Sequence, residues 1–243
     1  MKKKTIFNSL IIELLSEDKE LLNTFQLFIL NLINYYSDIK ENIVDEVNKI
    51  WQLFEHTNIF YDEKKANGIF GELLTMYFFK IKFNISIIEF WHSNFNNLFD
   101  FEFRYNLILE VKSTTNSSRI HSFNHEQIFS TQETKKVISS VILSKRDKGL
   151  SLYDFSLQLK EIFNDYEFAC KVDTLFFKFG ISEFKKGPCI DLEKTMLNIK
   201  IYDSHFIPQF QEIPSGIKNL KYDVNLEKIQ YLTENTVFSI FNN

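Results

Sequence analysis

The chain has 243 residues, of which 44% are hydrophobic and 27 are Phe, so it can bury a large core and is not expected to be disordered. Its formal net charge of −4 provides no general attraction to nucleic acid, so any such contact requires a local basic patch or a partner subunit. Two cysteines, Cys170 and Cys189, lack paired spacing, which argues against a zinc site or a disulfide framework and is typical of a reducing cytosol.

Apolar residues at spacings of three and four predict a helical N-terminal region over residues 1–65. The helices are expected near 10–15, 21–36 and 43–54. A short run of lysines followed by apolar residues is the start of a signal-peptide pattern, but Glu13, Glu17 and Asp18 interrupt it and no small-residue cleavage site follows. No stretch approaches a membrane span free of charge, so we expect a cytoplasmic protein.

A helix and a series of strands are predicted from residue 66 onward. Apolar spacing predicts the helix over Ala66–Phe83, with Glu72 in its first turns. Alternation of apolar and polar residues predicts strands near 86–91, 98–104, 107–113, 119–124 and 136–143. Gln127 lies at the start of a further expected helix, just after the fourth of these strands.

The C-terminal part of the chain is predicted to mix helices and strands. Ser151 is the expected N-cap of a helix over 152–163, and a second helix is expected to end at Gly180. Late strands are expected near 194–203 and 219–224, and Lys145 to Gly149 is expected to form a basic loop. Since no repeat or linker is present, we expect one α/β core with helical N-terminal and mixed C-terminal additions.

Two strand-like runs, at 99–103 and 107–112, separate apolar from polar side chains. Side chains alternate between the faces of a strand, so each run has one apolar face. The polar face carries Asp100, Glu102, Glu110 and Lys112, with Ile108 among them. Three acids and a lysine on one face of a hairpin are an unusual arrangement.

The register of this hairpin can be predicted from the same alternation. If Phe101 faces Leu109, all apolar residues share one face and Asp100 meets Glu110. The loop then has the common length of three residues and ends at Asn106, at the position that favours positive φ.

This pattern predicts metal chemistry. Carboxylates that converge repel each other and need a cation. Mg²⁺ takes oxygen ligands, usually one or two carboxylates with water and substrate phosphate. The ammonium of Lys112 could orient water or stabilise charge on that phosphate. From the residues alone an ordinary hairpin with one wet face stays open as the alternative, because such alternation is common in antiparallel sheets.

The pattern Asp100…Glu110-Val111-Lys112 resembles the Asp…(Asp/Glu)-x-Lys core of the PD-(D/E)XK nuclease superfamily. More closely, the chain resembles the bacterial group called PD-(D/E)XK motif proteins. The other segments that carry the resemblance are Gly68–Leu74, Trp91, Phe99–Phe101, Leu109–Thr115, Arg119–Gln127, Tyr202–Pro208, Ile213–Ile217 and Tyr222–Val224. The proline that usually precedes the first acid is absent, and Phe99 takes its place.

The resemblance implies a restriction-endonuclease-like core, a mixed central sheet flanked by helices, over 66–145, with a C-terminal α/β extension over 146–243 packed on it. It also implies catalytic residues and ligands for Mg²⁺ or Mn²⁺. The metal ligands would be Asp100, Glu110 and the Val111 carbonyl, and the catalytic set Asp100, Glu110, Lys112, Glu72 and Gln127. Lys112 would position the attacking water or stabilise the transition state, Glu72 would bind metal-ligating water or a second ion, and Gln127 would orient Lys112 or a phosphate.

The resemblance further implies an endonuclease acting on double-stranded DNA, as the nuclease subunit of a restriction or anti-phage defence system. The sequence has no glycine-rich phosphate-binding loop, so any ATP hydrolysis would come from a partner. Such partners would be ATPase, helicase or methyltransferase subunits. The alternative is a catalytically silent subunit of nuclease fold, kept for DNA docking or assembly.

Three further residues are open to a functional or a structural interpretation. His121 and His125 flank the fourth predicted strand and could touch phosphate, although a lone His is more often a hydrogen-bonded core or surface residue. Trp91 is expected to be a core or interface aromatic.

Overall fold

The structure is a computed structural model that describes residues 62–92, 97–129, 134–179, 184–185 and 187–242, together with 22, 25, 26 and 29. The chain forms two compact units, Met1–Thr57 and Asn58–Asn243. Apart from those isolated helical positions in the first unit, the helices predicted before residue 62 lie outside the described residues. The elements below all belong to the second unit.

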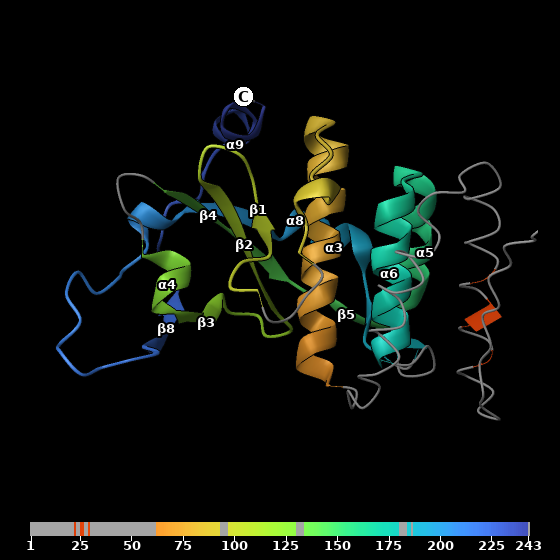
Figure 1. Ribbon diagram of the computed structural model, residues 1–243, viewed down its shortest axis with the longest axis horizontal. Coiled ribbons are helices and arrows are strands. Elements are labelled where there is room, and N and C mark those ends of the chain that lie inside the picture. The colour runs from red at the N-terminus through yellow and green to blue at the C-terminus, as the bar shows by residue number, and fades with distance from the viewer. Residues whose placement is uncertain are drawn as a thin grey trace, which may run out of the picture. The chain divides into compact units, whose positions relative to one another are not determined.

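A four-stranded mixed sheet lies at the centre of this unit (Figure 1). Its strands, in spatial order, are β1 (Phe101–Glu102), β2 (Leu107–Thr114), β4 (Lys135–Ile142) and β7 (Ile199–Asp203). β2 runs parallel to β4, whereas β1 and β7 are antiparallel to their neighbours. The two central strands are covered on both faces, so Leu109, Val137 and Ser139 have no exposed surface.

Helix α3 (Glu63–Phe83) packs on one face of β2. The Asp62 carboxylate caps its first turn by accepting from the Lys64 N–H, and Asn84 ends it with a φ of 55°. Gly71 permits the close approach, because a Cβ there would lie 2.8 Å from the Cβ of Ser113 on β2. The helix that carries Glu72 is therefore fixed tightly against the strand that carries Glu110.

Two more helices extend this layer, as Figure 1 shows. α5 (Leu152–Phe163) contacts α3, and α6 (Tyr166–Phe179) contacts α5. The rings of Phe70 and Phe155 join α3 to α5 with centroids 5.6 Å apart. This side of the sheet holds the larger hydrophobic core.

The opposite face of the sheet is covered by a two-stranded ribbon and a short helix. β3 (Ile120–Asn124) pairs antiparallel with β8 (Lys221–Asn225), and α4 (His125–Ile128) follows β3 directly. Ile138 points to this side, whereas its neighbour Val137 belongs to the core under α3. The second, smaller core comprises Phe123, Ile128, Ile138, Tyr202, Ile207, Val224 and Leu226.

The remaining elements lie around the sheet. They are η1 (Ile88–Phe90), β5 (Lys145–Ser151), β6 (Cys189–Ile190), α8 (Leu192–Leu197), η2 (Ser204–Phe206) and α9 (Glu234–Phe241). Among the described residues, no helix combines the length and the apolar character needed to cross a membrane.

The predicted fold class, a mixed sheet flanked by helices, is confirmed. The predicted register is also confirmed, since Phe101 pairs with Leu109. Asn106 has a φ of 55°, as the three-residue loop requires. The helix at 152–163 begins and ends where apolar spacing placed it, with Ser151 as its N-cap.

Several local predictions were wrong. Residues 86–91 form the short 3₁₀ helix η1 and then one isolated bridge from Trp91 to Phe101, not a strand. Of the strand predicted at 98–104, only the two residues of β1 form a strand. A longer strand would need the Val111 N–H for backbone pairing, but this N–H donates to the Asp100 side chain instead.

Two corrections concern the C-terminal half. Residues 145–149 belong to strand β5 instead of a loop: Lys145 pairs with Ile190 of β6, the register shifts between Lys145 and Leu150, and Gly149 lies directly against the Ile190 backbone. The strand predicted at 194–203 is helix α8 followed by β7, since the Asp191 carboxylate caps a helical turn there. The expected helix end at Gly180 lies outside the described residues.

Candidate active site

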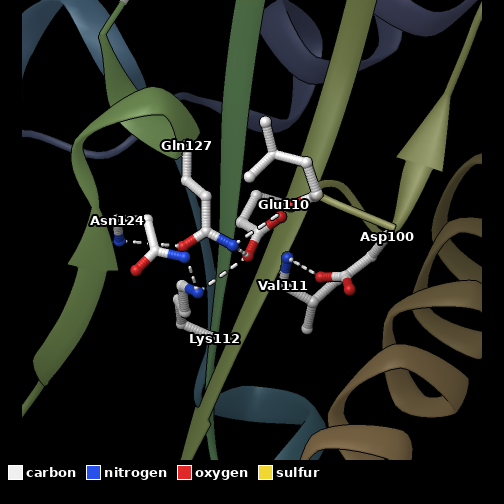
Figure 2. A network of polar contacts seen from close by, with 7 residues as sticks. Asp100, Glu110, Val111, Lys112, Asn124 and Gln127 are labelled. Carbon is white, nitrogen blue, oxygen red and sulfur yellow. Dashed lines mark hydrogen bonds and ion pairs between the residues drawn. The ribbon is translucent and has the colours of Figure 1, made fainter. Parts of the chain in front are cut away.

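The side chains of Glu110, Lys112 and Gln127 meet between β2 and α4 (Figure 2). Alternation along β2 places the first two on the same side of the strand, and α4 brings Gln127 over them. Lys112 Nζ lies 2.7 Å from Glu110 Oε1 and donates to Gln127 Oε1 at 2.9 Å. Gln127 Nε2 donates to the same Glu110 oxygen at 2.6 Å. The three side chains thus form a closed triangle of hydrogen bonds.

The orientation of the Gln127 amide is fixed by its neighbours. Its oxygen accepts from Lys112 Nζ and from the Asn124 backbone N–H at 3.1 Å, which completes the capping box of α4. Its nitrogen donates to Glu110 and to the Leu98 carbonyl at 3.2 Å. Because donors lie on one side and acceptors on the other, the amide can take only this orientation.

Asp100 lies directly before β1 at the edge of the sheet, beside β2. Its Oδ2 accepts from the Val111 N–H at 2.7 Å, and its backbone carbonyl accepts from the His92 N–H at 2.9 Å. The first bond ties the Asp100 carboxylate to the residue between Glu110 and Lys112, as Figure 2 shows.

Glu72 approaches from α3. Its Oε2 accepts from the indole Nε1 of Trp91 at 2.7 Å, and Trp91 is itself buried. The charge of Asp100 is the strongest one acting on Glu72, followed by that of Glu110. Three carboxyl groups from three elements therefore lie within electrostatic range of one another.

Burial dominates the electrostatics of the site. Burial raises the pKa of the Glu110 carboxyl to about 8, and the Asp100 charge adds to the rise while Lys112 opposes it. Burial and then the Asp100 charge raise the pKa of Glu72 well above its usual range. Burial also raises the pKa of Asp100, against the lowering effect of the Val111 N–H. All three acids can be ionised together at neutral pH only if a cation joins them.

The residues fit a divalent cation of the magnesium type. Glu110 Oε2 is buried and has no hydrogen-bond partner, so one oxygen of a carboxylate held by Lys112 and Gln127 is left to bind something else. Within the described ranges no group of three His, Cys, Asp or Glu side chains is assembled for a metal. Mg²⁺ does not need one, because it is usually held by one or two carboxylates with water and phosphate.

The two histidines considered from sequence have packing roles. His121 is buried with Nε2 2.8 Å from Ser140 Oγ, and burial lowers its pKa to about 4, which leaves it neutral. His125 stacks on Phe129 with ring centroids 4.8 Å apart. Neither is therefore placed to bind phosphate.

Two residues that sequence reasoning did not assign to the site lie beside its acids. Trp91 is a core aromatic, as expected, but it is also the hydrogen-bond donor to Glu72. His92 lies next to Asp100, lowers its pKa, and has its Nε2 3.7 Å from the Glu102 carboxylate. The one signal for either was the position of Trp91 among the segments that carry the family resemblance.

The chain belongs to the family described as "Putative PD-(D/E)XK family member" (DUF4420), whose sequence model matches residues 2–227. The match supports membership of the PD-(D/E)XK superfamily and a restriction-endonuclease-like fold, and it indicates a nuclease. Searches among curated proteins and among solved structures gave no match.

Proposed function

We propose that this protein is a metal-dependent endonuclease that cleaves double-stranded DNA as part of a restriction or anti-phage defence system. One observation carries the proposal: the buried Glu110 carboxylate is held by Lys112 and Gln127 through one oxygen, while its other oxygen has no partner. A structural acid would have both oxygens satisfied, because an unpaired buried polar atom is destabilising.

Asp100 and Glu110 would hold Mg²⁺ or Mn²⁺, with the Val111 carbonyl as a third ligand. The Val111 N–H already fixes the Asp100 carboxylate beside the residue whose carbonyl would be that third ligand. Glu72 would bind a water on the metal, kept in place by Trp91. When bound, such an ion lowers the pKa of water and neutralises charge on the scissile phosphate.

Lys112 would act on the reacting groups. Its Nζ is held by Glu110 and Gln127, and it would be directed toward a phosphate or the attacking water when substrate is bound. Gln127 would be a positioning residue, because it holds Lys112 and Glu110 at once. An ammonium aimed at the charge that develops on phosphate contributes strongly in a water-poor site.

The net charge of the chain and its lack of a nucleotide-binding motif support a role for partner subunits. A net charge of −4 and the absence of a phosphate-binding glycine loop indicate that the chain depends on other subunits for tight DNA binding and for ATP. We therefore expect ATPase, helicase or methyltransferase partners, and weak duplex binding by the isolated chain.

A second candidate function is a silent DNA-docking or assembly subunit of such a complex. The observation in its favour is that, in the part of the chain that the structure describes, no three metal-ligating side chains converge. The net acidity of the chain points the same way.

A plasmid-nicking assay with Mg²⁺, Mn²⁺ or EDTA separates the two functions when it is combined with calorimetric metal titration. We expect metal-dependent nicking that Asp100→Asn and Glu110→Gln abolish. The matched control is Glu102→Gln, which changes an exposed acid of the same hairpin and should retain activity. Metal binding without nicking, even with the subunits encoded beside this gene, would leave only the docking function.

A further inference from the structure

The tip of the β1–β2 hairpin contains an unusual residue. The described residues other than glycine with positive φ are Asn84, Tyr105, Asn106, Asn164 and Asn219. Asparagine is the side chain that best tolerates this region, whereas Tyr105, with a φ of 59°, gains no such local compensation. The fold alone would thus favour Asn or Gly at this position, so another role accounts for a tyrosine.

Tyr105 packs on little of its own protein. It is 90% exposed, more than any other large hydrophobic residue in the described ranges. Two exposed cationic residues lie near it in the chain fold: Arg104 precedes it, and the Lys135 backbone is joined to the turn because its N–H donates to the Asn106 carbonyl at 3.0 Å. An exposed aromatic ring near two cations is a combination that suits nucleic acid, with the ring on sugars or bases and the cations on phosphates.

The tip lies close to the candidate site along the same hairpin. Tyr105 is five residues before Glu110, which at about 3.3 Å per residue is at most about 16 Å along the hairpin. Base pairs repeat about every 3.4 Å along a duplex, so Tyr105 would lie within about five base pairs of a phosphate bound at the site. Figure 1 shows β1 and β2 side by side, with their connection at one end of the sheet.

We propose that the hairpin tip, defined as Arg104, Tyr105 and Lys135, is a DNA-contacting element next to the site of cleavage. Tyr105 contacts sugars or bases, and the two cations contact phosphates on either side of it. This inference rests on the proposed function and deepens it, because it names the surface by which the chain holds its substrate. The net negative charge makes such a local element necessary for any binding by the chain itself.

The test compares the DNA affinity of each variant with its thermal stability. Fluorescence anisotropy with a labelled duplex, in Ca²⁺ to prevent cleavage, gives the Kd of the full chain, and thermal unfolding gives its stability. Tyr105→Asn should weaken binding about tenfold, the effect of losing one aromatic contact, while unfolding occurs at the same or a higher temperature. Tyr105→Phe should bind like the wild type. A purely structural tyrosine would show no such divergence between affinity and stability.

Control variants allow the inference to be refuted separately from the proposed function. Leu197→Asn changes another highly exposed apolar residue, on α8, and should leave the Kd unchanged. Arg104→Ala and Lys135→Ala should each reduce the slope of log Kd against log salt by about one. If the wild type binds duplex and Tyr105→Asn binds equally well, the inference fails while the proposed function stands. If the wild type binds no duplex in Ca²⁺ and nicks no plasmid in Mg²⁺, both fail together.

Discussion

Glu110→Gln should change how the stability of the metal-free protein depends on pH. The Glu110 carboxyl has a pKa of about 8 in the folded protein, against an ordinary value of 4.5. Because the folded value is the higher one, the folded state keeps a proton that the unfolded state releases. The stability that Glu110 contributes is therefore complete below pH 4.5 and is lost progressively as the pH rises to about 8.

The size of the effect follows from the pKa difference. Between pH 4.5 and pH 7, about 2.5 pH units at about 1.36 kcal/mol each amount to a loss of about 3 kcal/mol through Glu110. Glutamine cannot ionise and avoids this loss. Its amide nitrogen would lie at the place of Glu110 Oε2, where the protonated wild-type carboxyl also carries an unpaired donor. The variant should therefore be about as stable as the wild type at pH 4.5 and about 3 kcal/mol more stable at pH 7.

Urea unfolding in EDTA at pH values from 4.5 to 8 measures this difference directly. The difference in unfolding free energy between Glu110→Gln and the wild type should change by about 3 kcal/mol over the lower part of that range. Glu102→Gln, which removes an exposed carboxylate from the same hairpin, is the matched control. A constant difference for Glu110→Gln would refute the reasoning, because the acid would then be ionised and satisfied in the metal-free fold.

Three further outcomes are expected. Lys112→Met should reduce single-turnover cleavage by about 10²-fold or more while Mg²⁺ still raises the unfolding temperature, since the ammonium acts on the reacting phosphate. Trp91→Phe keeps an aromatic ring but removes the donor to Glu72, so the Mg²⁺ concentration for half-maximal cleavage should rise about tenfold with little change in fold by circular dichroism. Gly71→Ala should lower the unfolding free energy measured in urea by about 1–3 kcal/mol, because its Cβ would lie 2.8 Å from a side chain of β2. The control is Gly68→Ala, whose Cβ meets nothing within 4 Å and which should raise the unfolding free energy slightly.

The hairpin could be predicted from sequence because its determinants are local. Alternation of Phe with acids sets the faces, and a three-residue loop ending at Asn106 sets the register, so the pairing of Phe101 with Leu109 needed no tertiary information. The same holds for α5, where apolar spacing and the Ser151 cap agree.

Long-range contacts decide the features that the sequence did not reveal. A wet polar face on β2 had stayed open as the alternative, but α4 and β3 cover this face, and Glu110 is only 2% exposed. The basic run at 145–149 resembles a loop, and its place in β5 depends on β6, far along the chain, which pairs with Lys145 and again with Leu150. The bond from Trp91 to Glu72 joins a 3₁₀ segment to a helix, and no spacing rule predicts such a contact.

Because Lys112 and Glu110 both bond the Gln127 amide, the arrangement of the site depends on whether the short helix α4 is folded. α4 has a single turn, which is far too short to persist alone, and the oxygen that caps it is the one that Lys112 uses. When α4 opens, Lys112 and Glu110 lose the same partner at the same moment. On the proposed function, the fraction of molecules able to react would not exceed the fraction with this turn closed, and hydrogen exchange at the Phe129 amide, bonded to the His125 carbonyl at 2.8 Å, would report that fraction.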